Sequence, residues 1–397
     1  MKKLVLSLAA GVMAASMAVS AASTINFEIN GSNAMVIGET VETKTTAHPI
    51  YVPVDKSYIS VDDVKAFLGA DVEILDEASA KLTKNGESYT GECIEKDGVF
   101  YLPLREAAEM TGFDVEYVFS HNSILISDKP AAVKVNGVTG VSADELAFYY
   151  DRIGAPGGNV TEEMVQQAKN DTVQGLTENA IIYQTAINSG FSATMMNEEA
   201  KAGIKTNSET FEVPVIAALE NEKINVISMY LNTIATAITD PAEEEIAEYY
   251  KENYVTAKHI LVLSEGGKAA SDEEAKKEAE RILKEVKAGK DFDKLMTEFC
   301  EDPGVQTNPD GYTFTKGEMV PEFETAAYAL KEDEVSDVIK TSYGYHIIKR
   351  LPLSEMGDAQ KQAVAINIKN KEYSDFVFGL FEKATVEKSD EVIASIK

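Results

Sequence analysis

The chain has 397 residues, of which 66 are acidic and 37 basic, so its formal net charge is −29. This excess of negative charge argues against binding to nucleic acid or directly to anionic lipid, because both partners are themselves negative. The length predicts two or three domains after processing. Cys93 and Cys300 fall in different predicted modules, so we expect no structural disulfide. No zinc or haem spacing is present, and we expect no metal ion and no cofactor.

The first 22 residues predict a secretory signal peptide. Lys2 and Lys3 form a basic start, an apolar stretch rich in Ala and Ser follows, and the small residues Val19 and Ala21 precede the expected cut. We therefore expect a cleaved signal and an extracytoplasmic protein, either secreted or held at the cell surface or wall. An uncleaved membrane anchor is the alternative. No Cys lies near the cut, so this segment encodes no lipoprotein anchor.

Residues 24–130 predict a β-rich domain with an internal repeat. Two stretches echo each other, PIYVPVDKSYISVDDVKAFLGADVEILDEASAKLT and VFYLPLREAAEMTGFDVEYVFSHNSILIS. Each predicts an aromatic-x-Pro strand, an amphipathic helix, a DVE strand and a hairpin. The pattern resembles the copper amine oxidase N-terminal-like domain of many secreted bacterial proteins. The resemblance implies no copper site, and His48 and His121 alone supply no ligand set. Attachment to a cell-wall or envelope component and a spacer role both remain open.

Residues 131–252 predict a mainly helical segment. Ser142 and Glu145 form a capping box ahead of a helix that carries several aromatic residues. Further helical runs cover residues 161–189 and 209–238. The sequence PAEEEIAEYYKENY then predicts another helix, which leads into the next module.

Residues 253–353 predict a compact α/β module with the order strand, two helices, strand, helix, two strands. AKHILVL suits a buried strand, Ser271 begins a capping box with Glu274, and Asp291 caps a second helix with one apolar face. GYTF predicts the second strand, and Pro321 suits the first position of the third helix. The closing VSDVIKTSYGYHIIKRL predicts two strands joined by a tight turn.

Four pieces of this module resemble the parvulin family of peptidyl-prolyl isomerases: the opening KHILV, the EDPG loop, the GEMVPEFE stretch and the closing GYHIIK. They occur in the family's order and cover about the whole module. The resemblance implies cis/trans isomerisation of X-Pro bonds, whose barrier is about 20 kcal/mol and whose mechanism needs no covalent step. An apolar pocket that grips the proline ring and favours the twisted amide lowers this barrier by differential binding.

The resemblance also implies the site residues. The family's ring pocket contains a Met and a Phe, which correspond here to Met319 and Phe323, with Phe314 beside them. Two inward His flank a Cys or Asp in the family, and the matching residues here are His259, Asp302 and His346. Without the family, Met319 and Phe323 indicate ordinary core spacing at a helix start. Each His inside an apolar strand would indicate a buried, hydrogen-bonded side chain.

The chain departs from the family pattern at two places. It has NPDGYTF where the family usually has GGDLGWF, so Gly311 falls near a position often held by a pocket Leu. We then expect a shallower pocket, or one lined by Tyr312. Tyr343, which we expect among the substrate-binding residues, stands where phosphate-directed members place a Ser, and the loop after the first strand offers only Lys268 as a cation. We therefore expect no phosphopeptide preference, since a phosphate dianion needs paired cations.

Residues 354–397 predict one long amphipathic helix and a short terminal element. Helices before and after the module resemble the PrsA and SurA type of extracytoplasmic foldase, in which both flanks form one chaperone lobe and the isomerase is an insertion. The predicted fold is therefore multidomain α+β, with a β-rich N-terminal domain, a mainly helical chaperone lobe and an inserted parvulin-like α/β module.

The expected function is that of a secreted foldase. It would bind unfolded or partly folded exported polypeptides and isomerise their X-Pro bonds. Two alternatives remain. One is a holding chaperone of the same architecture with an inactive module, for which Gly311 and the altered GYTF loop are the motive. The other is a cell-envelope interaction protein that acts through its N-terminal domain.

Overall fold

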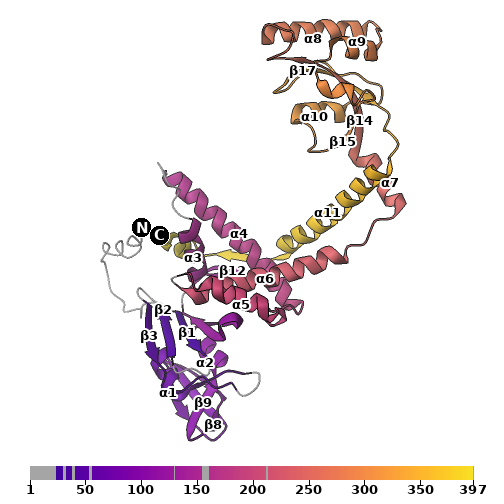
Figure 1. Ribbon diagram of the computed structural model, residues 1–397. Coiled ribbons are helices and arrows are strands. Elements are labelled where there is room, and N and C mark those ends of the chain that lie inside the picture. The colour runs from indigo at the N-terminus through magenta and orange to yellow at the C-terminus, as the bar shows by residue number, and fades with distance from the viewer. Residues whose placement is uncertain are drawn as a thin grey trace. The chain divides into compact units, whose positions relative to one another are not determined.

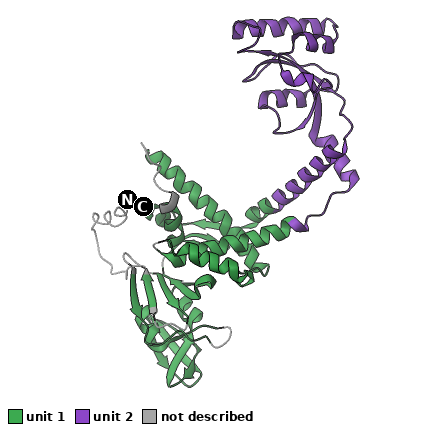
Figure 2. Ribbon diagram, in the orientation of Figure 1, with its two compact units in different colours: residues 1–235, 377–397 green, residues 236–376 purple. Residues whose placement is uncertain are grey.

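The computed structural model describes residues 24–29, 33–37, 41–52, 56–128, 130–153, 161–211 and 213–396. The predicted signal peptide lies outside these residues. The chain divides into two compact units, unit 1 with residues 1–235 and 377–397, and unit 2 with residues 236–376 (Figure 2). Among the helices of the described ranges, none is long and apolar enough to cross a membrane.

The first part of unit 1 is β-rich. A five-stranded antiparallel sheet has the order β10-β11-β1-β2-β3, and two three-stranded sheets have the orders β4-β9-β8 and β5-β6-β7 (Figure 1). The strands are β1 Thr24–Glu28, β2 Asn33–Ile37, β3 Val41–Thr45, β4 Tyr58–Ser60, β5 Asp71–Ile74, β6 Ser79–Lys84, β7 Glu87–Glu92, β8 Ile94–Lys96, β9 Val99–Pro103, β10 Asp114–Val118 and β11 Ser123–Ser127. The helical pieces are α1 Val61–Asp63, the π-helix η1 Val64–Leu68, α2 Leu104–Met110 and the 3-10 helix η2 Phe119–His121. Phe27, Leu68 and Ile126 lie at the centre of their shared core.

The internal repeat of the sequence recurs in the structure. Strand, helix and two strands follow one another twice, first as β4, α1 with η1, β5 and β6, then as β9, α2, β10 and β11. One boundary differs from the prediction: the strand that enters the first helix is β4, whereas Tyr51 in the aromatic-x-Pro segment forms only an isolated bridge with Tyr58. The reason is Ser60, whose hydroxyl accepts the Asp63 N–H at 3.1 Å and so fixes the helix start immediately after β4.

The second part of unit 1 is mainly helical. It contains α3 Ala143–Ile153, α4 Glu162–Asn188, the 3-10 helix η3 Ala193–Met195, α5 Glu198–Ser208 and α6 Pro214–Ala237. The predicted capping box before α3 is confirmed: the Ser142 N–H donates to Glu145 at 2.7 Å, and the Glu145 N–H donates to the Ser142 hydroxyl at 3.1 Å.

The end of the chain returns to this helical part. A three-stranded sheet of order β13-β12-β18 contains β12 Ala131–Val135, β13 Val138–Ser142 and β18 Val386–Lys388. Val133 pairs with Lys388 in that sheet, and Val392 of the terminal helix α12 Asp390–Ser395 packs into the same core as Val173. The short terminal element predicted after the long helix is thus a strand followed by a helix. Segments from both sides of the α/β module therefore share one hydrophobic core.

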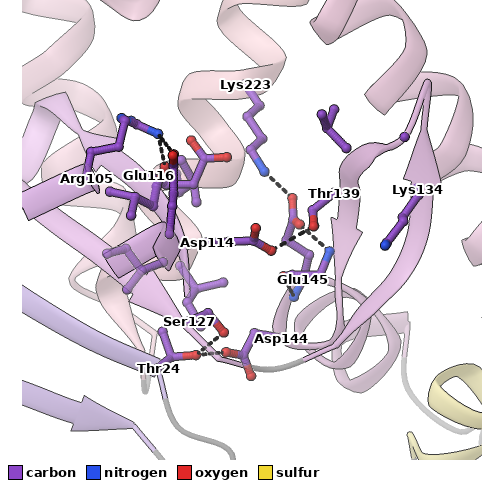
Figure 3. A pocket seen from close by; sticks show the side chains of 18 residues that line it. Thr24, Arg105, Asp114, Glu116, Ser127, Lys134, Thr139, Asp144, Glu145 and Lys223 are labelled. Carbon is purple, nitrogen blue, oxygen red and sulfur yellow. Dashed lines mark hydrogen bonds and ion pairs between the residues drawn. The ribbon is translucent and has the colours of Figure 1, made fainter. Parts of the chain in front are cut away.

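A pocket of about 540 Å³ lies where the β-rich and helical parts of unit 1 meet (Figure 3). Ionisable side chains from both parts line it, and Lys223 of α6 forms an ion pair with Glu145. Beside it, the buried Glu222 carboxylate accepts the backbone N–H groups of Phe119 and Ser120 at 3.0 and 2.6 Å. The Glu222 contact attaches the helical part to the β-rich part, whereas the Lys223–Glu145 pair joins α6 to α3 within the helical part.

Unit 2 contains the predicted α/β module. Its four-stranded antiparallel sheet has the order β15-β14-β17-β16, with β14 Tyr254–Leu263, β15 Tyr312–Thr315, β16 Ile339–Lys340 and β17 Gly344–Leu351. Its helices are α8 Asp272–Lys287, α9 Phe292–Phe299, the 3-10 helix η4 Pro303–Gln306 and α10 Pro321–Ala329. The predicted order of elements is confirmed. Ser271 and Asp291 cap α8 and α9, and Pro321 is the first residue of α10.

The sheet of the module is covered on both faces. Helices α8 and α9 pack on one face, where Ile260 and Ile347 are fully buried, and α10 packs on the other (Figure 1). Beside the module, α7 Glu243–Asn253 packs its Ile246 and Tyr250 against Val364 and Ile368 of α11 Asp358–Lys383. The long C-terminal helix thus finds a partner for its apolar face in the helix that leads into the module.

Candidate active site

Two histidines lie close together on the α10 face of the sheet. In the antiparallel pair of β14 and β17, His259 lies opposite Ile348, and His346 lies opposite Leu261. Successive side chains of a strand alternate between faces, so these two residues are diagonal neighbours on the same face. Their ring centroids are 5.3 Å apart, and the residues are only 6% and 5% exposed.

Asp302 completes the predicted polar set. Its Oδ2 lies 3.2 Å from His259 Nε2. Asp302 also caps η4, because its Oδ1 accepts the Gly304 N–H at 2.9 Å. The turn that the sequence DPG predicts therefore places the Asp302 carboxylate next to the His259 imidazole.

The surroundings keep both imidazoles neutral at pH 7. Burial lowers the pKa of His259, although the Asp302 carboxylate opposes this shift. Burial, with the neighbouring His259, lowers the pKa of His346 to about 4. The Asp302 carboxylate accepts a hydrogen bond from the Nε2–H group of neutral His259, so Nδ1 of this ring carries a lone pair and no proton. Within the described residues, Nδ1 of each ring is buried and has no hydrogen-bond partner.

Thr341 is a site residue that the sequence analysis missed. Its buried hydroxyl lies 2.9 Å from His346 Nε2 and accepts the Tyr343 N–H at 3.2 Å. The only sequence signal is its place at the turn before β17, five residues ahead of the histidine. Tyr343 itself is 60% exposed, so its backbone, rather than its ring, joins this group of hydrogen bonds.

The apolar residues predicted for the ring pocket border the histidines. The Phe323 ring makes edge contacts with both imidazoles, with centroids 5.4 Å apart in each case. Phe314 lies 5.9 Å from Phe323 and is almost fully buried. Met319 is half-buried at the edge of the same cluster, where a ligand can reach it.

Gly311 departs from the family pattern for a structural reason. Its φ is +93°, and a Cβ there would lie 2.6 Å from the backbone oxygen of Ala257 in β14. Only glycine fits this close approach between strands. Tyr312 lines the site in its place: its ring stacks on His259 with centroids 5.7 Å apart and an interplanar angle of 28°.

Neither cysteine is disulfide-bonded, as predicted. Cys300 lies beside the site, where its Sγ accepts the Leu261 N–H at 3.3 Å, and burial raises the pKa of its thiol. It therefore stays protonated at neutral pH and is a poor nucleophile. Within the part of the chain that the structure describes, no group of three or more His, Cys, Asp or Glu side chains is arranged to hold a metal ion.

We expect the module to lose stability in acid through His346. The pKa of His346 is about 4 in the folded chain, and its ordinary value is 6.5. Between pH 4 and 6.5 the unfolded chain therefore binds more protons than the folded chain. The free energy of unfolding is therefore fully retained above pH 6.5. It should fall as the pH drops towards 4, by on the order of 3 kcal/mol.

The measurement is urea unfolding at pH 7 and 4.5, followed by the NMR signals of Ile347 and Ile348. The His346→Phe variant should lose less stability than the wild type between these two pH values. Equal losses in both proteins would assign the acid sensitivity to other groups.

Residues 259–351 match the family model described as Rotamase, PPIC-type PPIASE domain. Foldase protein PrsA of Geobacillus kaustophilus is 33% identical over 202 residues, which cover 48% of this chain and 67% of the relative. Foldase protein PrsA 1 of Bacillus cereus is 35% identical over 198 residues, covering 47% and 60%. The parvulin-like PPIase of Rickettsia prowazekii is 32% identical over 187 residues, covering 44% and 61%. The crystal structure of PrsA from Bacillus cereus has a TM-score of 0.31 and 22% identity, with 60% of this chain and 93% of that chain covered.

Proposed function

The chain belongs to the PrsA foldase family and contains a parvulin-type peptidyl-prolyl isomerase domain, and from this premise we propose that it isomerises X-Pro bonds of exported polypeptides at the site around His259 and His346. The observation that carries the proposal is the arrangement on the α10 face of the sheet. There, two neutral imidazoles and a carboxylate border an apolar cluster that a ligand can reach.

This arrangement suits a noncovalent mechanism. In the planar amide the nitrogen lone pair is delocalised, whereas in the twisted transition state it is localised and the carbonyl is less polar. Apolar surroundings stabilise the twisted form relative to the planar one. Met319, Phe314 and Phe323 would hold the proline ring, and the neutral imidazoles would contact the amide without a charge that favours its polar planar form.

The main reason to expect an inactive isomerase module no longer applies. It depended on Gly311 as a missing pocket side chain, and the backbone approach to Ala257 now accounts for this glycine. Tyr312 occupies the site beside His259 instead. The geometry therefore favours an active isomerase over a module that only holds its clients.

The proposed substrates are unfolded or partly folded exported proteins without phosphorylation. Glu301 accepts the N–H groups of Leu263 and Lys268 at 2.8 and 2.7 Å. A carboxylate therefore lies against the loop after β14, which would have to supply cations to a phosphate. Tyr343, at the position of the phosphate-directed Ser, offers no cation either.

The remaining domains receive roles in the same proposal. Residues 131–252 and 354–397 would form the chaperone lobe around the isomerase of residues 253–353. Residues 24–130 would attach the secreted protein to a cell-wall or envelope component. The shared core of β12, α4 and α12 supports a single lobe built from both flanks. The excess of negative charge suits a soluble protein in an anionic envelope.

Replacing Met319 with alanine should reduce isomerisation at least tenfold, which corresponds to about 1.4 kcal/mol of transition-state binding. The reason is that Met319, unlike the buried Phe314 and Phe323, is half-buried at the edge of the cluster and would contact a ligand more than it supports the core. The measurement is cis-to-trans relaxation of short X-Pro peptides with acidic, basic and apolar X.

The matched control is Met164→Ala, because Met164 is 50% exposed on α4 of unit 1. An unchanged rate in the Met319 variant would remove this residue from the site. A wild-type chain that accelerates none of the peptides would refute the proposed isomerase and leave a holding chaperone.

A further inference from the structure

The hydroxyl of Tyr312 makes a contact that the ring pocket alone does not require. It donates a hydrogen bond to Asp302 Oδ2 at 3.0 Å. The same oxygen lies 3.2 Å from His259 Nε2. The other carboxylate oxygen accepts the Gly304 N–H at 2.9 Å. Three donors from η4, β15 and β14 therefore hold one carboxylate.

Two glycines make this contact sterically feasible. Gly311 permits the close approach of β15 to β14 that sets Tyr312 beside His259. Gly304 leaves room for the phenol, because a Cβ on Gly304 would lie 2.3 Å from the Tyr312 hydroxyl oxygen. The absence of a side chain at Gly311 and at Gly304 thus allows Tyr312 to take its position.

We propose that Tyr312 is a positioning residue of the isomerase, whose hydroxyl holds Asp302 against His259 Nε2 while its ring covers one face of the His259 imidazole. The proton of neutral His259 then stays on Nε2, and the Nδ1 lone pair stays directed into the site. The orientation of His259 is set from two sides, by the carboxylate and by the stacked ring at 5.7 Å. This inference rests on the proposed function, since it assigns a role within the same site.

The Tyr312 hydroxyl also weakens the electrostatic effect of the Asp302 carboxylate on His259. A hydrogen bond to a carboxylate stabilises its negative charge, so less of that charge favours the imidazolium. The titratable groups that face His259 are Asp302 from η4, Tyr312 from β15, His346 from β17 and Cys300 after α9. Helix α10 contributes the apolar ring of Phe323. Loss of the Tyr312 hydroxyl should therefore raise the pKa of His259 and shift the acid limb of activity to higher pH.

The experiment compares three variants of the full chain. Tyr312→Phe removes the hydroxyl and keeps the ring. Gly304→Ala keeps the tyrosine but places a methyl group where its hydroxyl lies. Tyr328→Phe is the matched control, because it removes a hydroxyl that donates to the Asn253 backbone oxygen at 2.6 Å in the same unit. The readouts are kcat/KM on X-Pro peptides against pH, and the His259 tautomer from long-range 1H–15N NMR correlations.

Tyr312→Phe and Gly304→Ala should each lower kcat/KM about three- to tenfold. Each should also move the acid limb upward by about half a pH unit and mix the two His259 tautomers. The double variant should be no worse than either single variant, because both act on one hydrogen bond. Tyr328→Phe should keep the wild-type pH profile and tautomer.

A folded Tyr312→Phe protein with wild-type kcat/KM, acid limb and tautomer would overturn the inference, and so would an equal shift in Tyr328→Phe. If Tyr312→Phe fails to fold, Gly304→Ala decides the question by the same readouts. The tautomer spectrum does not depend on turnover. A wild-type chain without activity would therefore refute the proposed function, while the spectrum would still judge the role of Tyr312.

Discussion

Replacing Gly311 with leucine, the residue that many parvulins carry near this position, should unfold the isomerase module rather than deepen its pocket. The φ of +93° lies in the left-handed region, where a side chain costs about 1–2 kcal/mol. The new Cβ would also lie 2.6 Å from the Ala257 backbone oxygen, and a central strand cannot move aside as a flexible side chain can. The combined loss should exceed about 3 kcal/mol and displace Tyr312 and Phe314 from the site.

Gly317→Leu is the matched control for this variant. Gly317 has a φ of +88°, but nothing lies within 4 Å of a Cβ built there. This control therefore carries the backbone cost without the clash. Urea unfolding and peptide relaxation of both variants separate the cost of the backbone conformation from the cost of the clash with Ala257. Equal destabilisation in the two proteins would contradict the role of the strand contact, and a stable Gly311→Leu variant with faster catalysis would show that the pocket can be deepened.

The sequence predicted the module well because its signals are local. Ser271, Asp291 and Pro321 mark helix starts by chemistry that acts within one turn. Strand alternation places His259 and His346 on one face once β14 and β17 pair. The family motifs then named the residues that the structure brings together, including Asp302 at 3.2 Å from His259.

The features that sequence reasoning missed depend on contacts between distant segments. No local sequence pattern predicts that Gly304 of η4 makes room for Tyr312 of β15. Nor does one predict the hydrogen bond between Thr341 and His346 across a turn. Tyr51 lies in a stronger strand pattern than Tyr58, yet the cap at Ser60 decides where the first repeat begins its helix. The pairing of β18 with β12 joins residues about 250 positions apart and likewise has no local signal.

The charged group around Lys223 is a further long-range feature, and Lys223→Met should destabilise unit 1 by about 3–5 kcal/mol. Lys223 bonds to Glu145 (Figure 3). It also lies 3.6 Å from Glu220, and the side chains of Lys223, Glu145 and Glu220 are only 13%, 9% and 6% exposed. Burial and the neighbouring Glu145 raise the pKa of Glu220 well above its usual value. Burial also opposes ionisation of Glu145, but the Lys223 ammonium and the hydrogen bonds from Glu220, Lys223 and the Ser142 N–H together outweigh it and lower the pKa of that carboxyl. Methionine fills a similar volume but leaves a buried carboxylate without its cation.

Two further variants test whether the lost charge causes this effect. Lys201→Met removes a lysine paired with Glu198, which is 91% exposed on α5, and should cost less than about 1 kcal/mol. The triple variant Lys223→Met, Glu145→Gln, Glu220→Gln removes the unpaired charge and should recover much of the stability, because the glutamine at position 145 retains an acceptor for the Ser142 N–H. Urea unfolding measures all three proteins. X-Pro peptide relaxation should stay near the wild-type rate, since the isomerase site belongs to unit 2. If the Lys223→Met protein were as stable as the Lys201→Met protein, water or a proton would already compensate the buried carboxylates. The ion pair between Lys223 and Glu145 would then not be the contact that holds α6 to α3.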